Sequence, residues 1–120
     1  MRSLTTLILI GSAFLAVLAG CATSPDPELV SEGREVYLAE GCAACHGRER
    51  QGGSMGPDLR RVRRHWSADE LAKYLADPAS HRQQQARLQR LSRRYAAQMP
   101  SFAALPEERR AALAAYLWSR

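Results

Sequence analysis

The chain has 120 residues, of which 46% belong to the hydrophobic set and 24% are charged, and its formal net charge is +5. This length suits one domain and excludes a multidomain enzyme, a polytopic membrane protein and a low-complexity disordered chain. Aromatic residues make up only 7% of the chain, so its apolar fraction consists mainly of alanine and leucine. A small core of this kind is weak, and short chains commonly recruit a cofactor, a metal or a disulfide.

Residues 1–20 are typical of an export signal. The apolar stretch from Leu4 to Leu18 is shorter than the roughly 20 residues that span a bilayer, and small residues precede Cys21. Leu18-Ala19-Gly20-Cys21 resembles the lipobox of bacterial lipoproteins, and this resemblance implies that Cys21 carries a lipid as the first mature residue. The alternative is an uncleaved anchor helix. Both place the domain on the periplasmic side of a bacterial membrane, the inner or outer membrane being undecided.

The mature chain begins with a linker at residues 21–28, and one domain is expected over residues 29–120. Two prolines in the linker predict an extended segment. A first helix is predicted from Leu29 to Glu40, because Leu29, Gly33, Val36 and Tyr37 share one face at helical spacing. Glycine within a helix costs about 1 kcal/mol relative to alanine, so we expect another element to approach closely at Gly33. Gly41 suits the end of this helix.

The sequence Cys42-Ala43-Ala44-Cys45-His46 matches the signature of covalent haem attachment. Two thiols at this spacing on a tight turn can each add to one vinyl group of the same porphyrin, and His46 then directs its imidazole at the iron. Covalent attachment retains the haem in an exported protein. The haem also supplies apolar surface that the alanine-rich core lacks.

Three other uses of this cysteine pair are a redox pair, a zinc site and a disulfide. A thioredoxin-like redox pair needs a preceding strand and a βαβ context, which the sequence does not show. A zinc site needs a second pair of ligands, and His65 and His81 lack the paired spacing. A disulfide is compatible with export, but it is strained across two residues and leaves His46 without a role.

The remaining elements complete an all-α prediction of about four helices with long loops. Residues 52–57 form a glycine-rich loop, and a capping box at residues 67–70 begins a helix that ends at Asp77-Pro78. Residues 80–98 contain five arginines and no acid, and Leu88, Leu91 and Tyr95 lie at helical spacing, which predicts a basic amphipathic helix. The last helix is expected from Pro106 to Trp118.

These motifs together resemble the class I c-type cytochromes, in the small bacterial form with one haem. The resemblance covers nearly all of residues 29–120, and its motifs occur in the family's order: Gly41 to Gly47, Gly56-Pro57-Asp58-Leu59, Met99-Pro100-Ser101-Phe102 and Ala115-Tyr116-Leu117. It implies a class I cytochrome c fold around one covalently bound haem c, with the first helix crossing the last one near Tyr116. It also implies an electron carrier, not an enzyme by itself.

The resemblance also implies the iron ligands. His46 binds one face of the iron and Met99 supplies a thioether sulfur to the other, which favours reduced iron and raises the potential. Met55 is a second candidate for the sixth ligand, and ligation by His65 or His81 is a third. The carbonyl of Pro57 is expected to accept a hydrogen bond from the other ring nitrogen of His46; the alternative is an ordinary turn proline.

Basic side chains are expected to serve the haem and its partners. One of Arg60, Arg61, Arg63, Arg64 and Trp66 is expected to bind the haem propionates. Residues 22–45 contain five acids and one arginine, whereas residues 46–100 contain twelve lysines or arginines and five acids. This imbalance predicts redox partner proteins with an acidic docking surface, and the alternative is a generic solvated basic surface. A membrane contact through the lipid anchor is expected, and nucleic acid is not.

The predicted function is therefore a membrane-tethered carrier that passes single electrons between periplasmic or membrane redox partners. The alternative function is a haem sensor or weak peroxidase with an open or labile sixth iron site. A third possibility is a structural lipoprotein without haem.

Overall fold

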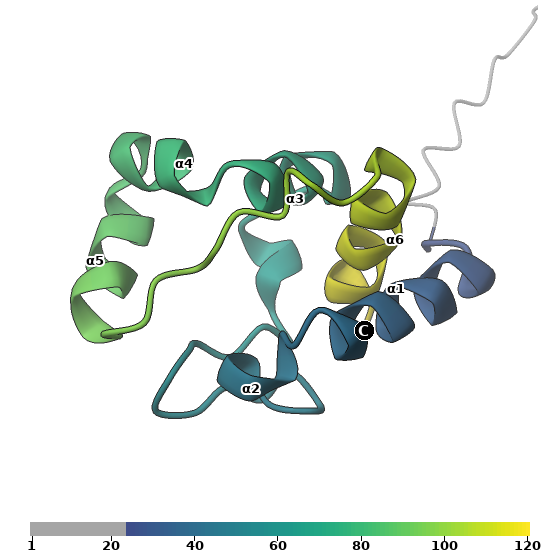
Figure 1. Cartoon of the computed structure of the whole chain (residues 1–120), viewed down its shortest axis with the longest axis horizontal. Coiled ribbons are helices and arrows are strands. Elements are labelled where there is room, and N and C mark those ends of the chain that lie inside the picture. The colour runs from purple at the N-terminus through teal and green to yellow at the C-terminus, as the bar shows by residue number, and fades with distance from the viewer. Residues whose placement is uncertain (1–23) are drawn as a thin grey trace, which may run out of the picture.

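The computed structural model describes residues 24–120 as a bundle of helices with long connecting segments (Figure 1). The expected export signal and Cys21 lie outside the described residues. In chain order the elements are α1 (Pro27–Ala39), α2 (Ala43–His46), the 3-10 turn η1 (Val62–Arg64), α3 (Ala68–Ala76), α4 (Pro78–Gln84), α5 (Ala86–Arg94) and α6 (Glu107–Trp118). Residues 24–120 contain no strand, which confirms the all-α class. No helix among them is long and apolar enough to cross a membrane.

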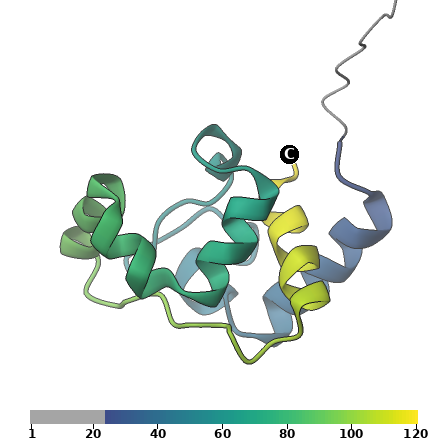
Figure 2. The ribbon, with the colours of Figure 1, turned by 90° about the horizontal axis from the view of Figure 1, so that it is seen from above.

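Helices α1 and α6 cross in close contact, as Figures 1 and 2 show. A Cβ atom on Gly33 would lie 1.9 Å from the carbonyl oxygen of Ala112 and 2.7 Å from the Cβ of Tyr116. The rings of Tyr37 and Tyr116 meet edge to face with centroids 5.4 Å apart. The glycine that weakens α1 as an isolated helix thus permits main-chain contact with α6, which confirms the expected close approach.

The core lies around α6, whose residues 112–117 are all buried between α1 and α3. On the α3 side, Leu71 and Leu75 are 4% and 1% exposed. The predicted capping box is confirmed, since the Ser67 hydroxyl accepts from the Glu70 amide and the Glu70 carboxylate accepts from the Ser67 amide. Helix α3 thereby begins at a defined point beside α6.

The single basic helix predicted over residues 80–98 is wrong, because the chain forms two helices there. Gln85 has an extended backbone, with φ −120° and ψ 113°, and separates α4 from α5. Helix α4 begins at Pro78, before the predicted start at residue 80. The side chain of Asp77 accepts a hydrogen bond from the Ser80 amide, and Pro78 occupies the first turn. After the break α5 turns away from the axis of α4 (Figure 1). The turn brings Leu88 and Leu91 to the wall of a cavity.

Candidate functional site

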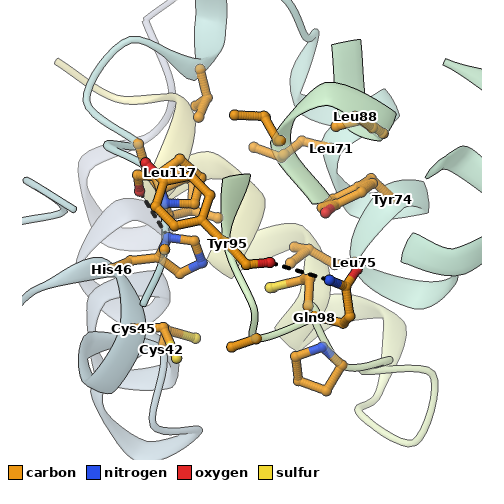
Figure 3. A pocket seen from close by; sticks show the side chains of 18 of the residues that line it. Cys42, Cys45, His46, Leu71, Tyr74, Leu75, Leu88, Tyr95, Gln98 and Leu117 are labelled. Carbon is orange, nitrogen blue, oxygen red and sulfur yellow. Dashed lines mark hydrogen bonds between the residues drawn. The ribbon is translucent and has the colours of Figure 1, made fainter. Parts of the chain in front are cut away.

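A cavity of about 290 Å³ lies between α2, α3, α5 and the segment that joins α5 to α6 (Figure 3). Most of its lining is apolar. The lining includes all five residues predicted to bind the cofactor: Cys42, Cys45, His46, Pro57 and Met99. The apolar lining includes Leu59, Val62, Leu71, Leu75, Leu88, Leu91, Phe102 and Leu117. An apolar space with a few convergent polar groups is typical of a cofactor site.

The two cysteines of the motif lie on one side of this cavity. Gly41 has φ 74°, a conformation that glycine adopts without strain, and it turns the chain from α1 into α2. One helical turn then places Cys42 and Cys45 on the same face, because residues three apart on a helix are neighbours. Both are free thiols, and Figure 3 shows their sulfur atoms beside His46. Burial raises the pKa of the Cys42 thiol to about 11, so this thiol is protonated at neutral pH.

His46 is buried, at 8% exposure, and its two ring nitrogens have different surroundings. Nδ1 lies 2.9 Å from the carbonyl oxygen of Pro57. Because a carbonyl only accepts, we assign the proton to Nδ1, which leaves the lone pair on Nε2. Figure 3 shows Nε2 directed into the cavity. Burial lowers the pKa of His46 against the opposing effect of the Pro57 hydrogen bond, so the ring is neutral, the form that binds a metal.

The loop that carries Pro57 packs directly on the imidazole ring. A Cβ on Gly56 would lie 3.1 Å from both Nδ1 and Cε1 of His46 and 3.1 Å from the Cys45 carbonyl oxygen. A side chain at this position would require the loop or the ring to shift by a few tenths of an ångström. Gly56 thus allows the carbonyl of Pro57 to lie at Nδ1 of His46.

Tyr37 holds the chain just after His46, a contact that the sequence analysis did not anticipate. Its hydroxyl donates to the carbonyl oxygen of Gly47 at 2.6 Å, and the amide of Gly52 donates to the carbonyl oxygen of His46 at 2.8 Å. A buried tyrosine usually finds a partner for its hydroxyl, which was the available signal. These bonds connect the haem motif to the α1–α6 crossing.

Met99 lines the same cavity as His46, from the segment between α5 and α6. Two hydrogen bonds join the residues just after Met99 to the end of α3. The Ser101 hydroxyl donates to the Ala76 carbonyl at 2.6 Å, and the Phe102 amide donates to the Leu75 carbonyl at 2.8 Å. Arg110 of α6 donates to the carbonyl of Ala103 at 3.1 Å and to that of Leu105. In Figure 3, Leu75 and Gln98 lie across the cavity from the His46 ring.

The other candidate ligands are less well placed. Met55 also lines the cavity, but it is 51% exposed, whereas Met99 is partly buried against the core. His65 is an exposed residue of the lining. The Nδ1 of His81 lies 2.9 Å from the Asp77 carbonyl oxygen, outside the lining. Within residues 24–120, no three His, Cys, Asp or Glu side chains gather as a metal site would require.

Only part of the predicted propionate-binding set reaches the cavity. Arg61 and Trp66 line it, whereas Arg60 is exposed and pairs with Asp58, which holds the pKa of that carboxyl at about 2. Arg63 lies over the ring of Trp118, at 6.0 Å. The lining instead includes two arginines that the sequence analysis missed, Arg82 and Arg87. The second offered a signal, because Arg87 is four residues before Leu91 and so shares its helical face.

The cytochrome c family model matches residues 30–120, and the chain therefore belongs to the cytochrome c family. Comparisons with curated proteins and with solved structures give no significant match. Membership implies covalently attached haem c with iron, redox partner proteins and haem-based electron transfer. The residues present fit this cofactor, since two thiols, a neutral imidazole and a thioether share one apolar cavity.

Proposed function

We propose that this protein is a membrane-tethered carrier with one haem, in which Cys42 and Cys45 form the thioether bonds and His46 and Met99 bind the iron. The observation that carries the proposal is the state of His46. Its Nδ1 is engaged by the Pro57 carbonyl and its Nε2 points into the cavity that Met99 also lines.

The bound haem supplies one-electron chemistry at its iron. The protein's own residues control the conditions for that chemistry. The Pro57 carbonyl holds the imidazole of His46 in one orientation and one tautomer, which keeps Nε2 available and raises its basicity. Apolar side chains exclude water from the cavity, and the thioether of Met99 favours the reduced iron. No residue is assigned to transform a substrate.

The proposed location is the periplasmic side of a bacterial membrane, through a lipid on Cys21. The export signal, the lipobox and the proline-containing linker support it. Tethering raises the effective concentration of the carrier near membrane partners. The excess of arginine in residues 46–100 supports partners with acidic docking surfaces, because opposite charges steer encounter. Cys21→Ser should abolish incorporation of a labelled fatty acid into the holoprotein, and labelling that persists would contradict a lipid on Cys21.

The visible spectrum of the haem-loaded full chain tests the axial ligands. We expect low-spin spectra in both oxidation states and no response to carbon monoxide. Met99→Ala should open the sixth position, giving a high-spin component and ready carbon monoxide binding. Met55→Ala is the matched control and should behave as the wild type. Carbon monoxide binding by the wild type would overturn the carrier proposal and favour a sensor or weak peroxidase, while a spectral loss in Met55→Ala would reassign the ligand.

A further inference from the structure

Four hydrogen-bond donors meet on the cavity wall that α3, α4 and α5 form. They are Trp66, Tyr74, Arg82 and Arg87, and together they are called the donor cluster. The Arg87 guanidinium lies 5.1 Å from the centroid of the Trp66 ring, and the rings of Trp66 and Tyr74 are 5.0 Å apart. Arg82 and Tyr74 line the same wall. Burial raises the pKa of Tyr74, and the charges of Arg82 and Arg87 oppose that rise.

Within residues 24–120, the donor cluster has no anionic partner. Residues 78–98 contain no Asp or Glu. Within residues 24–120 the only ion pair is that of Arg60 with Asp58, and no hydrogen bond from the side chain of a cluster member is found there. The two carboxylates of the lining are Asp58, which is thus already paired, and Glu40, which ends α1 beside Cys42.

Unpaired arginines that are partly withdrawn from water predict an anionic ligand. Arg87 is half-buried, and burial lowers its pKa. Burying a charge is costly unless it is paired and hydrogen-bonded. The planar guanidinium fork matches a carboxylate in particular, because it can donate two parallel hydrogen bonds. A ligand of this wall therefore has to bring carboxylates into an otherwise apolar cavity.

We propose that the donor cluster binds the two propionate carboxylates of the haem, with the arginines of the α4–α5 hairpin supplying the charge. The inference rests on the proposed haem site. Attachment at Cys42 and Cys45 uses the two vinyl groups, and the propionates remain as the anionic part of the cofactor. The cysteines line the cavity near α2, whereas the donor cluster lines the wall of α3, α4 and α5. Of the residues expected to bind the propionates, Trp66 keeps that role, and Arg82 and Arg87 join it.

The proposal gives the α4–α5 hairpin a functional role. Helix α5 packs chiefly on α4 and contacts α1 and α6 little. Its inner face therefore borders the cavity and not another helix of the bundle. Ion pairs between Arg87 and a propionate would fasten the hairpin over the haem. They would also affect the midpoint potential, because a fixed positive charge near the iron disfavours the oxidised, more positive state.

Two arginines of the same helix provide a matched test. Arg87 lines the cavity, whereas Arg90 is exposed and does not line it. In the purified holoprotein, Arg87→Gln should lower the equilibrium constant for reduction about tenfold, which lowers the midpoint potential by about 59 mV for one electron. Arg90→Gln should change the midpoint potential little. Arg87→Lys keeps the charge and should retain most of the potential. Arg82→Gln is a second variant and should also lower the potential.

Infrared difference spectra between the oxidised and reduced forms give a readout that potential alone does not. With the haem carboxylates labelled with carbon-13, the labelled bands should shift in Arg87→Gln and stay in place in Arg90→Gln. Equal potential changes in the two glutamine variants, or unshifted bands in Arg87→Gln, would overturn the inference. If the inference fails in this way but all variants keep low-spin spectra, the proposed function is unaffected. Carbon monoxide binding by the wild type would instead refute the proposed function.

Discussion

Replacing Gly33 by alanine tests whether the close main-chain contact between α1 and α6 stabilises the fold. The new Cβ would lie 1.9 Å from the Ala112 carbonyl oxygen and 2.6 Å from the Ala112 carbonyl carbon. Ordinary contacts of a Cβ begin near 3.4 Å, so the two helices would have to separate by about 1.5 Å along that line. The obstacle is main chain, which cannot rotate away as a flexible side chain does.

Two opposing effects set the size of the change. Alanine improves the intrinsic stability of α1 by about 1 kcal/mol, and overpacking a tight interface costs about 1–3 kcal/mol. We take the upper end of that cost, because the contact is with main chain and the neighbouring Tyr37 and Leu113 are 0% exposed. The expected net loss is about 2 kcal/mol. For a domain of this size that corresponds to a fall in Tm of about 8–16 °C.

The assay is urea and thermal unfolding of the holoprotein, followed by far-ultraviolet circular dichroism and by haem absorbance. Gly53→Ala is the matched control, because no atom lies within 4 Å of the position of its new Cβ, and its stability should stay within about 0.5 kcal/mol of wild type. If Gly33→Ala is as stable as the wild type or more stable, helix propensity decides the outcome and the close-contact argument is refuted.

Three further changes test contacts around the cavity. Tyr37→Phe removes the hydroxyl that donates to the loop after the haem motif; we expect a loss of about 1 kcal/mol in urea unfolding with an unchanged visible spectrum, and an unchanged urea midpoint would contradict this. Arg110→Met frees the carbonyls that follow Met99; the low-spin spectrum should then be lost at a lower urea concentration than the helical signal, unlike the same change at position 109. The folded pKa of Asp58 is lowered from 3.8 to about 2 by its arginine partner, so its stabilising contribution is present above pH 3.8 and is lost as pH falls toward 2. Asp58→Asn should therefore flatten the dependence of the urea midpoint on pH between about 2 and 3.8. The effect should be small because the carboxyl is exposed to solvent. A pH dependence equal to that of the wild type at low salt would contradict this.

Local signals in the sequence predicted the helix boundaries that depend on local chemistry. The capping box at residues 67–70 formed as expected, since its hydrogen bonds join residues three apart. The same approach failed at residues 80–98, where arginine and leucine spacing favours one continuous helix. The break at Gln85 has no side-chain cap to announce it. The break allows α5 to line the cavity. That contact joins segments distant in the chain, so a short stretch of sequence does not reveal it.

The sequence by itself determined the attachment chemistry of this protein, because two thiols and an imidazole within five consecutive residues need only one helical turn to lie together. It also indicated the family, through motifs whose order survives along the chain. Only the tertiary structure decided which arginines face the haem cavity and which nitrogen of His46 is free. Arg87 lies 41 positions beyond His46 in the chain, and it reaches the cavity because α5 turns at Gln85. Such contacts depend on packing between distant segments, and packing is a property of the whole fold.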